Sequence, residues 1–125
     1  MKFIALMALF VCAGCATVTT ARQFQNVNVE NGEQPIETVV VENTAWKLFN
    51  FIPIASGNVK MPNKVTYVLF ADSTTLQNNL DMLEGEMKRV GATRIVNLRS
   101  KDIDESVFIM FLTRTTCQTS AVLLK

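Results

Sequence analysis

The sequence predicts a small α+β domain in which an antiparallel sheet carries one amphipathic helix on one face. Three observations lead to this fold class. Segments rich in β-branched and aromatic residues lie on both sides of a single helical segment. That segment, residues 74–90, has one apolar stripe at helical spacing. Strands, then a helix, then strands again is an order typical of α+β folds, and a chain of 125 residues allows one domain.

Residues 1–14 have the pattern of a cleaved signal peptide. Lys2 supplies a short positive start, and residues 3–13 form an unbroken apolar run. The run is shorter than the roughly 20 residues that span a bilayer, and it fits the apolar region of a signal peptide. The sequence Ala13-Gly14-Cys15 then places small residues before a cysteine, which resembles the bacterial lipobox, although Cys12 stands where leucine is usual.

The lipobox resemblance implies cleavage between Gly14 and Cys15 and lipidation of Cys15, so that the membrane is reached through a lipid anchor. The diacylglyceryl group and the N-acyl chain that such a cysteine carries exceed the two membrane-binding signals that stable anchoring needs. Ala16 follows the cysteine, where Asp favours inner-membrane retention in enterobacteria, so we expect the outer membrane, facing the periplasm. Two alternatives remain open. One is ordinary secretion with cleavage after Ala16 or Ala21, and the other is a core helix that contains two cysteines.

A flexible tether is expected to follow the lipidated cysteine over residues 15–36, with the domain at 37–125. The tether segment is rich in Thr, Asn and Gln and contains Gly32 and Pro35. Strands are predicted at 37–42 and 65–70. An apolar segment at 46–54 carries Pro53, which favours an edge strand or a loop in its second half.

The helix is the strongest local prediction. Thr74 and Gln77 have the spacing of a capping box, and Gly91 follows the last turn as a C-terminal cap. The apolar stripe consists of Leu76, Leu80, Leu83, Met87 and Val90. We expect this stripe to pack on a sheet that holds Val96, Leu98, Phe108 and Met110 or their opposite-face neighbours.

After the helix, a strand at 92–99 and a polar turn at 100–106 lead into an apolar segment at 107–113. An unbroken apolar run suggests a central strand covered on both faces. The two strands are expected to form a hairpin. Residues 120–124 form a last strand, and the sequence leaves open whether the chain turns at Gln118-Thr119 or continues straight.

Composition argues against several chemistries. Without residues 1–14, basic and acidic side chains balance at 11 each, whereas nucleic-acid binding favours a basic surface. The chain has no histidine, the commonest general base and metal ligand. It also lacks nucleotide-binding and nucleophile-elbow motifs. We therefore predict no enzymatic activity, no cofactor and no metal site, and read the acidic run at 102–105 as a solvated turn.

Two further features are candidates for contact or reactivity. Cys117 is the one thiol left once Cys12 is removed and Cys15 is acylated; a buried small side chain is expected, with an intermolecular disulfide or a reactive thiol as alternatives. Trp46, Phe49 and Phe51 alternate along one segment. They form a candidate contact patch if exposed and a core face if buried.

Several segments resemble a group of small, uncharacterised bacterial lipoproteins. They are FNFIPIASGN at 49–58, NNLDML at 78–83, GATRIVNL at 91–98 and the C-terminal residues 106–125, including QTSAVLLK. The resemblance covers most of the chain after Cys15 and implies no known activity. Residues 87–96 have a weaker, fold-level likeness to small envelope stress-sensor lipoproteins, whose paired cysteines this chain lacks.

These observations favour a membrane-anchored, non-enzymatic binding or structural module in the cell envelope. An envelope sensor or accessory subunit is the alternative, touching a protein partner through a sheet edge or the aromatic segment. A secreted periplasmic protein without lipid is a further alternative.

Overall fold

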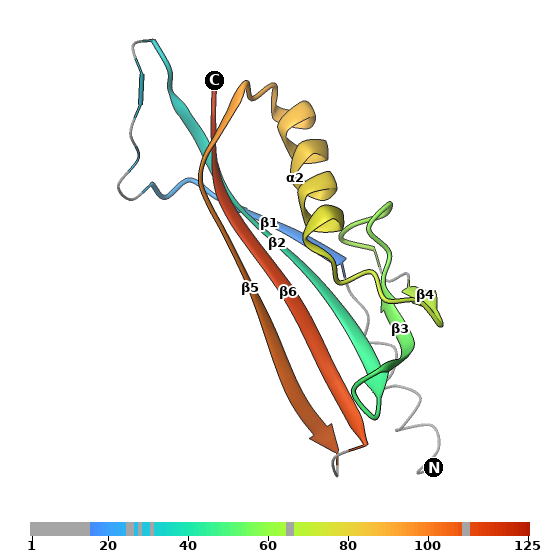
Figure 1. Ribbon diagram of the computed structural model, residues 1–125. Coiled ribbons are helices and arrows are strands. Elements are labelled where there is room, and N and C mark those ends of the chain that lie inside the picture. The colour runs from blue at the N-terminus through green and yellow to red at the C-terminus, as the bar shows by residue number, and fades with distance from the viewer. Residues whose placement is uncertain (1–15, 25–26, 28, 31, 65–66, 109–110) are drawn as a thin grey trace.

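The computed structural model describes residues 16–24, 27, 29–30, 32–64, 67–108 and 111–125, so the predicted signal peptide and Cys15 lie outside the described residues. The elements are β1 (Ala16–Ala21), β2 (Pro35–Leu48), β3 (Ile52–Gly57), β4 (Tyr67–Leu69), α2 (Leu76–Val90), β5 (Arg94–Phe108) and β6 (Leu112–Leu124). The expected antiparallel sheet with one helix is confirmed, and the sheet dominates (Figure 1). None of the described helices is both long and apolar enough to cross a membrane.

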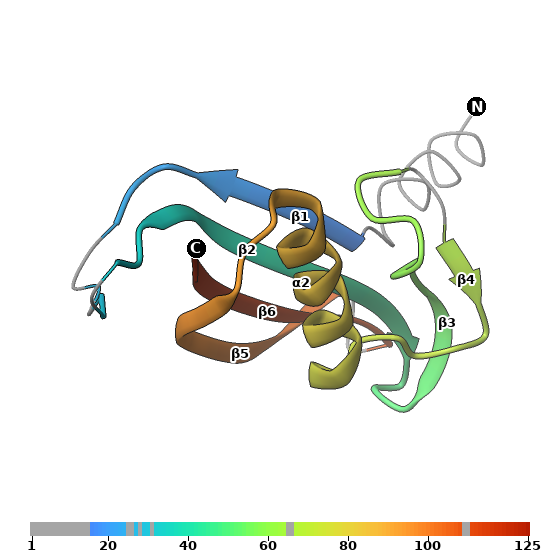
Figure 2. The same ribbon diagram turned by 90° about the horizontal axis from the view of Figure 1, so that it is seen from above.

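Strand β2 organises the sheet, whose main strand order is β4-β3-β2-β6-β5 with antiparallel pairing throughout. One edge of β2 pairs with β6 along nearly its whole length. The other edge is divided, because β1 pairs with residues 38–43 and β3 with residues 45–48. Figure 2 shows β1 lying beside β2 on the side away from β6. The first described residues, from Ala16 on, are therefore a strand of the sheet.

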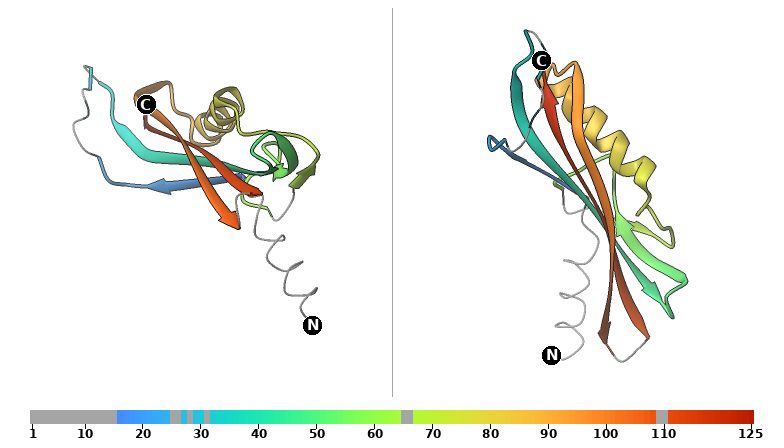
Figure 3. Two further views of the ribbon diagram at one scale, coloured as in Figure 1. Left: turned by 60° about the horizontal axis from the view of Figure 1, so that its bottom comes forward. Right: turned by 60° about the vertical axis from the view of Figure 1, so that its left-hand side comes forward.

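Helix α2 covers one face of the sheet, and no other element of the described residues covers the opposite face (Figure 3). Side chains along β2 and β6 alternate between the two faces. Those facing the helix form the core with residues of β1 and α2. The core cluster is Ala16, Val39, Val41, Met82, Leu83, Ala121 and Leu123. The opposite face carries half-buried Thr38, Glu42, Thr44, Gln118 and Ser120, as on an antiparallel sheet with one solvated face.

The helix begins one residue later than its predicted cap. Thr75, not Thr74, is the N-cap, and its side chain accepts a hydrogen bond from the Asn78 backbone N–H at 3.2 Å. Thr74 instead bonds Asp72 in the preceding turn. The C-terminal prediction is confirmed: Gly91 has a φ of 71° and donates its backbone N–H to the Met87 carbonyl.

The buried face of α2 is rotated relative to the predicted stripe. Leu83 is fully buried, but Leu76 is exposed, and Asn79 and Met82 lie in the buried face instead. The helix packs on β2 and β6 in the middle of the sheet rather than on β5, where Leu98 is exposed. Of the other expected partners, Met110 and the side chain of Phe108 lie outside the described residues.

The predicted tether is wrong for its first part, because Ala16–Ala21 forms β1. Threonine favours strands, and a strand with one face in water needs apolar residues only at alternate positions, here Ala16 and Val18. The polar threonines at the other positions gave the segment the composition of a linker. Strand β2 also begins earlier than expected, at Pro35, and extends to Leu48.

The hairpin after the helix exists, but its turn is displaced. Residues 100–106 lie within β5, and the cross-strand register continues to Phe108 opposite Leu112. The charged residues of this segment predicted a turn. They lie in a strand instead, because β5 is an edge strand with exposed side chains. Of the apolar run at 107–113, residues 107–108 end β5 and residues 112–113 begin β6, so the run is not one central strand; Phe111 is exposed. The chain continues straight through Gln118-Thr119.

Candidate functional site

Helix α2 leaves one end of the sheet uncovered (Figure 1), and several apolar residues on the β2–β3 turn, on β3, at the end of β4 and just before β6 are exposed. Phe51 and Phe70 are 73% and 78% exposed. We call the following set the apolar rim: Phe49, Phe51, Ile52, Leu69, Phe70 and Phe111. Single exposed apolar residues are ordinary on soluble proteins, but several gathered at one end of a domain mark a contact surface.

Main-chain bonds join the segments that carry the rim. The Phe49 N–H donates to the Phe111 carbonyl at 2.7 Å, so the β2–β3 turn is tied to the β5–β6 end. The two rings meet edge to face, with centroids 5.4 Å apart. The Phe70 N–H donates to the Ile54 carbonyl at 2.9 Å, which ties the end of β4 to β3. The rim residues thus occupy neighbouring, connected segments.

Two rim phenylalanines adopt a left-handed backbone. Phe49 and Asn50 have φ angles of 52° and 66°, and the Phe51 N–H donates to the Leu48 carbonyl at 3.3 Å, as in a tight hairpin turn. Phe70 has a φ of 55°. This region costs a residue with a Cβ about 1–2 kcal/mol. Strain of this kind persists where the surrounding structure enforces it, often at functional positions.

The predicted contact patch is divided by the structure. Phe49 and Phe51 are exposed, as the contact interpretation requires, but Trp46 is only 5% exposed. Trp46 lies opposite Arg114 of β6 and Ala55 of β3, so neighbouring strands flank it on both sides. Trp46 is therefore not part of the exposed surface, and the rim takes its other members from segments distant in sequence.

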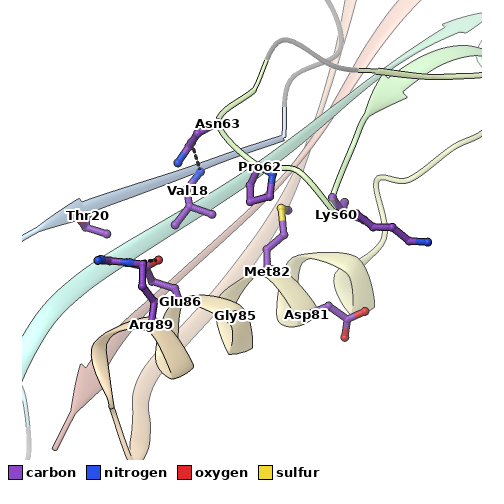
Figure 4. A pocket seen from close by; sticks show the side chains of 11 residues that line it. Val18, Thr20, Lys60, Pro62, Asn63, Asp81, Met82, Gly85, Glu86 and Arg89 are labelled. Carbon is purple, nitrogen blue, oxygen red and sulfur yellow. Dashed lines mark hydrogen bonds and ion pairs between the residues drawn. The ribbon is translucent and has the colours of Figure 1, made fainter.

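A groove of about 610 Å³ lies between α2, β1 and the loop at residues 58–64 (Figure 4). Met82 points from the helix toward Pro62, and Asn63 accepts the Val18 N–H at 2.8 Å. Gly85 lines the groove, and a Cβ there would meet no atom within 4 Å. Close approach of a strand therefore does not explain this glycine.

A carboxylate pair with an arginine lies at one end of that groove. The Arg89 guanidinium donates hydrogen bonds to the Glu86 carboxylate, and Arg89 Nη2 lies 3.9 Å from Glu37 Oε1. Glu37 is buried, and this burial raises the pKa of its carboxyl, with Glu86 beside it raising that pKa further. The Arg89 hydrogen bond holds the pKa of Glu86 below its usual value. One buried carboxyl thus stays neutral more readily than the other.

Buried amides and hydroxyls connect the helix to the sheet. The Asn79 amide donates to the Cys117 carbonyl at 2.9 Å and to Thr119 Oγ1 at 3.0 Å, while its own oxygen has no partner among the described residues. Near the start of the helix, Ser73 Oγ lies 2.8 Å from Ser56 Oγ, and Asn43 donates to the Ser73 carbonyl. These bonds fix α2 and the preceding segment against the sheet.

Cys117 is 2% exposed, which confirms the expected buried thiol. Burial raises the pKa of this thiol, and the neighbouring carboxylate of Asp102 adds to the increase. The thiol form is therefore favoured at neutral pH, which opposes reactivity as a nucleophile. Within the described ranges, no three His, Cys, Asp or Glu side chains gather in a way that could hold a metal ion.

The sequence reasoning missed Asn79, Leu69, Phe70 and Phe111. The asparagine carries no local signal, since burial depends on which side of the helix meets the sheet. The rim did leave a signal: residues 48–59, 65–71 and 106–113 contain no charge. That pattern fits both buried strands and an exposed apolar surface. Comparisons with protein-family models, curated proteins and solved structures find no match to this chain.

Proposed function

We propose that this chain is a bacterial lipoprotein, anchored in the outer membrane through Cys15 and facing the periplasm, whose domain is a non-enzymatic binding or structural module. The observation that carries the proposal is the motif Ala13-Gly14-Cys15 after a short apolar segment. The segment resemblance to small bacterial lipoproteins points in the same direction.

The position of β1 supports cleavage before Cys15 over secretion with cleavage after Ala21. Ala16 is buried in the core cluster, and β1 covers six residues of the β2 edge. Cleavage after Ala21 would remove this strand, expose a long row of unpaired backbone groups on β2 and open the core. Cleavage before Cys15 leaves the whole sheet intact and puts the acylated residue next to it.

The edge of the sheet formed by β5 gives less support to the alternative, an accessory subunit that adds a strand of a protein partner to its sheet. The outer strand β5 carries exposed Arg99, Lys101, Asp102, Asp104 and Glu105, and the pairing of β5 with β6 is irregular between Val96 and Arg99. Charges and bulges on an edge strand oppose the addition of another strand.

Metabolic labelling with a fatty acid, followed by intact mass measurement, tests the proposal. Labelled wild-type protein should lack residues 1–14 and carry acyl chains, and Cys15→Ser should abolish both processing and label. Cys12→Ser and Cys117→Ser are matched controls that should still be labelled. Label retained in the Cys15→Ser chain would reject the proposal. Separation of inner and outer membranes by density then tests the expected location.

A further inference from the structure

The apolar rim and the proposed anchor lie on the same side of the sheet. Ala16, the residue after Cys15, pairs with Asn43 on the edge of β2 that β3 also uses. Phe49, just past the end of β2, lies six positions beyond Asn43, a distance of about 20 Å at the usual strand rise of about 3.3 Å per residue. Ala16 is buried in the sheet, so the chain leaves no slack between anchor and domain.

The surface between these two points is also suited to a bilayer. The loop that bonds Ala16, through the Asn63 N–H at 2.8 Å, exposes Met61. Lys60 and Lys64 flank that methionine and are exposed, where they can meet lipid phosphates. Val68 of β4, the neighbour of the rim residue Leu69, is exposed as well.

Charges are absent from the rim and paired immediately behind it. Lys47, which precedes the β2–β3 turn, lies 2.7 Å from Asp72, and Arg114 pairs with Glu105. Phe49 stands two residues beyond Lys47, which corresponds to about 7 Å of strand. The charges nearest the rim are therefore neutralised by ion pairs, which lowers the cost of bringing them to the bilayer surface.

We propose that the apolar rim inserts into the periplasmic leaflet of the anchoring membrane, as a second contact beside the lipid on Cys15, with the β1–β3–β4 side of the sheet lying along the membrane. The proposal rests on the proposed function, because the anchor at Cys15 identifies lipid as the occupant. A domain held at two points about 20 Å apart lies along the surface with a fixed orientation, whereas a domain held by one lipidated residue pivots.

The test uses the full chain, produced in bacterial cells so that acylation takes place, and reconstituted in phosphatidylethanolamine and phosphatidylglycerol vesicles. Trp46→Phe removes the one native tryptophan, and Phe51→Trp places a fluorescent reporter on the rim. Leu98→Trp, in the same background, is the matched control, since Leu98 is half exposed but lies on β5 at the opposite edge. Lipids brominated on their acyl chains quench a tryptophan on contact.

We expect brominated lipid to remove half or more of the fluorescence of the Phe51→Trp chain and to leave the Leu98→Trp chain almost unchanged. Adding Phe70→Ser to the Phe51→Trp chain should reduce the quenching, because it removes a neighbouring insertion contact. Equal quenching of both reporters, or none on the rim, would overturn the proposal. A shift of the rim emission to shorter wavelength without quenching would also overturn it, because a protein or a second copy would then cover the rim.

The two proposals fail in distinguishable ways. Intact mass reads the acyl chains on Cys15 before reconstitution, so a chain without them rejects the proposed function. An acylated chain whose rim reporter is not quenched rejects the insertion alone.

Discussion

Both ends of the sheet carry large apolar side chains, but in opposite environments. At the end under α2, Val39, Val41 and Leu123 are fully buried against Leu83. At the other end, Phe51 and Phe70 are mostly exposed. The difference arises because one helix covers only part of a long sheet. Apolar strand residues are therefore core where the helix lies and surface where it does not, and stability should depend on the first group and binding on the second.

The largest expected effect is on the covered end. Leu83→Ala should lower the free energy of unfolding by about 2–5 kcal/mol, because it leaves a cavity between α2 and the sheet. Leu76→Ala, on the same helix but exposed, should change it by about 0.5 kcal/mol or less. Urea melts of both variants measure the difference. Equal losses would mean that the helix does not separate the two ends as described.

A smaller loss is expected at the polar contact within the covered end. Asn79→Ala should destabilise the domain by about 1–3 kcal/mol, since it removes two buried hydrogen bonds to β6. Gln77→Ala is the control, because its side chain bonds Asp81 at the surface. Equal free energies of unfolding for Asn79→Ala and Gln77→Ala would mean that apolar packing alone holds the helix on the sheet.

At the apolar rim, one substitution should raise the free energy of unfolding in urea melts instead of lowering it. Phe70→Gly should stabilise the domain by up to about 1 kcal/mol, because glycine adopts the left-handed backbone without cost. Phe51→Gly, equally exposed but at negative φ, should destabilise by about 0.5–1 kcal/mol. Membrane quenching should fall when Phe70 is replaced even as stability rises. A loss of stability in Phe70→Gly would place that ring in the folded-state packing.

The smallest effect is a pH dependence confined to the covered end. Glu37 has a raised folded-state pKa, so its contribution is present below the unfolded pKa and lost as pH rises through the folded value. Glu37→Gln keeps a neutral donor and should be more stable than wild type at pH 8, with the difference vanishing toward pH 4. Thermal melts across this range measure it. A constant difference at every pH would exclude titration of Glu37 as the cause.

Local patterns predicted several elements well. The helix ends at Gly91 because glycine accepts the left-handed cap, and a stripe at helical spacing identified the helix itself. The strands predicted at 37–42 and 65–70 correspond to β2 and β4, although the observed bounds differ from the predicted ones. Exposure of Phe49 and Phe51 agreed with one of the two interpretations of the aromatic segment, while burial of Trp46 agreed with the other.

By itself, the sequence determined the fold class and the position of the helix, because these depend on periodicity and short motifs, and it supplied the lipobox-like motif on which the proposed lipidation of Cys15 rests. Tertiary structure alone decided that Ala16–Ala21 is a strand, that β5 runs through a charged segment and that Asn79 is buried while Leu76 is not. The physical reason is coverage. A residue's burial depends on which element lies over it, and the local pattern of α2 does not reveal which strands the helix covers or how its buried face is rotated.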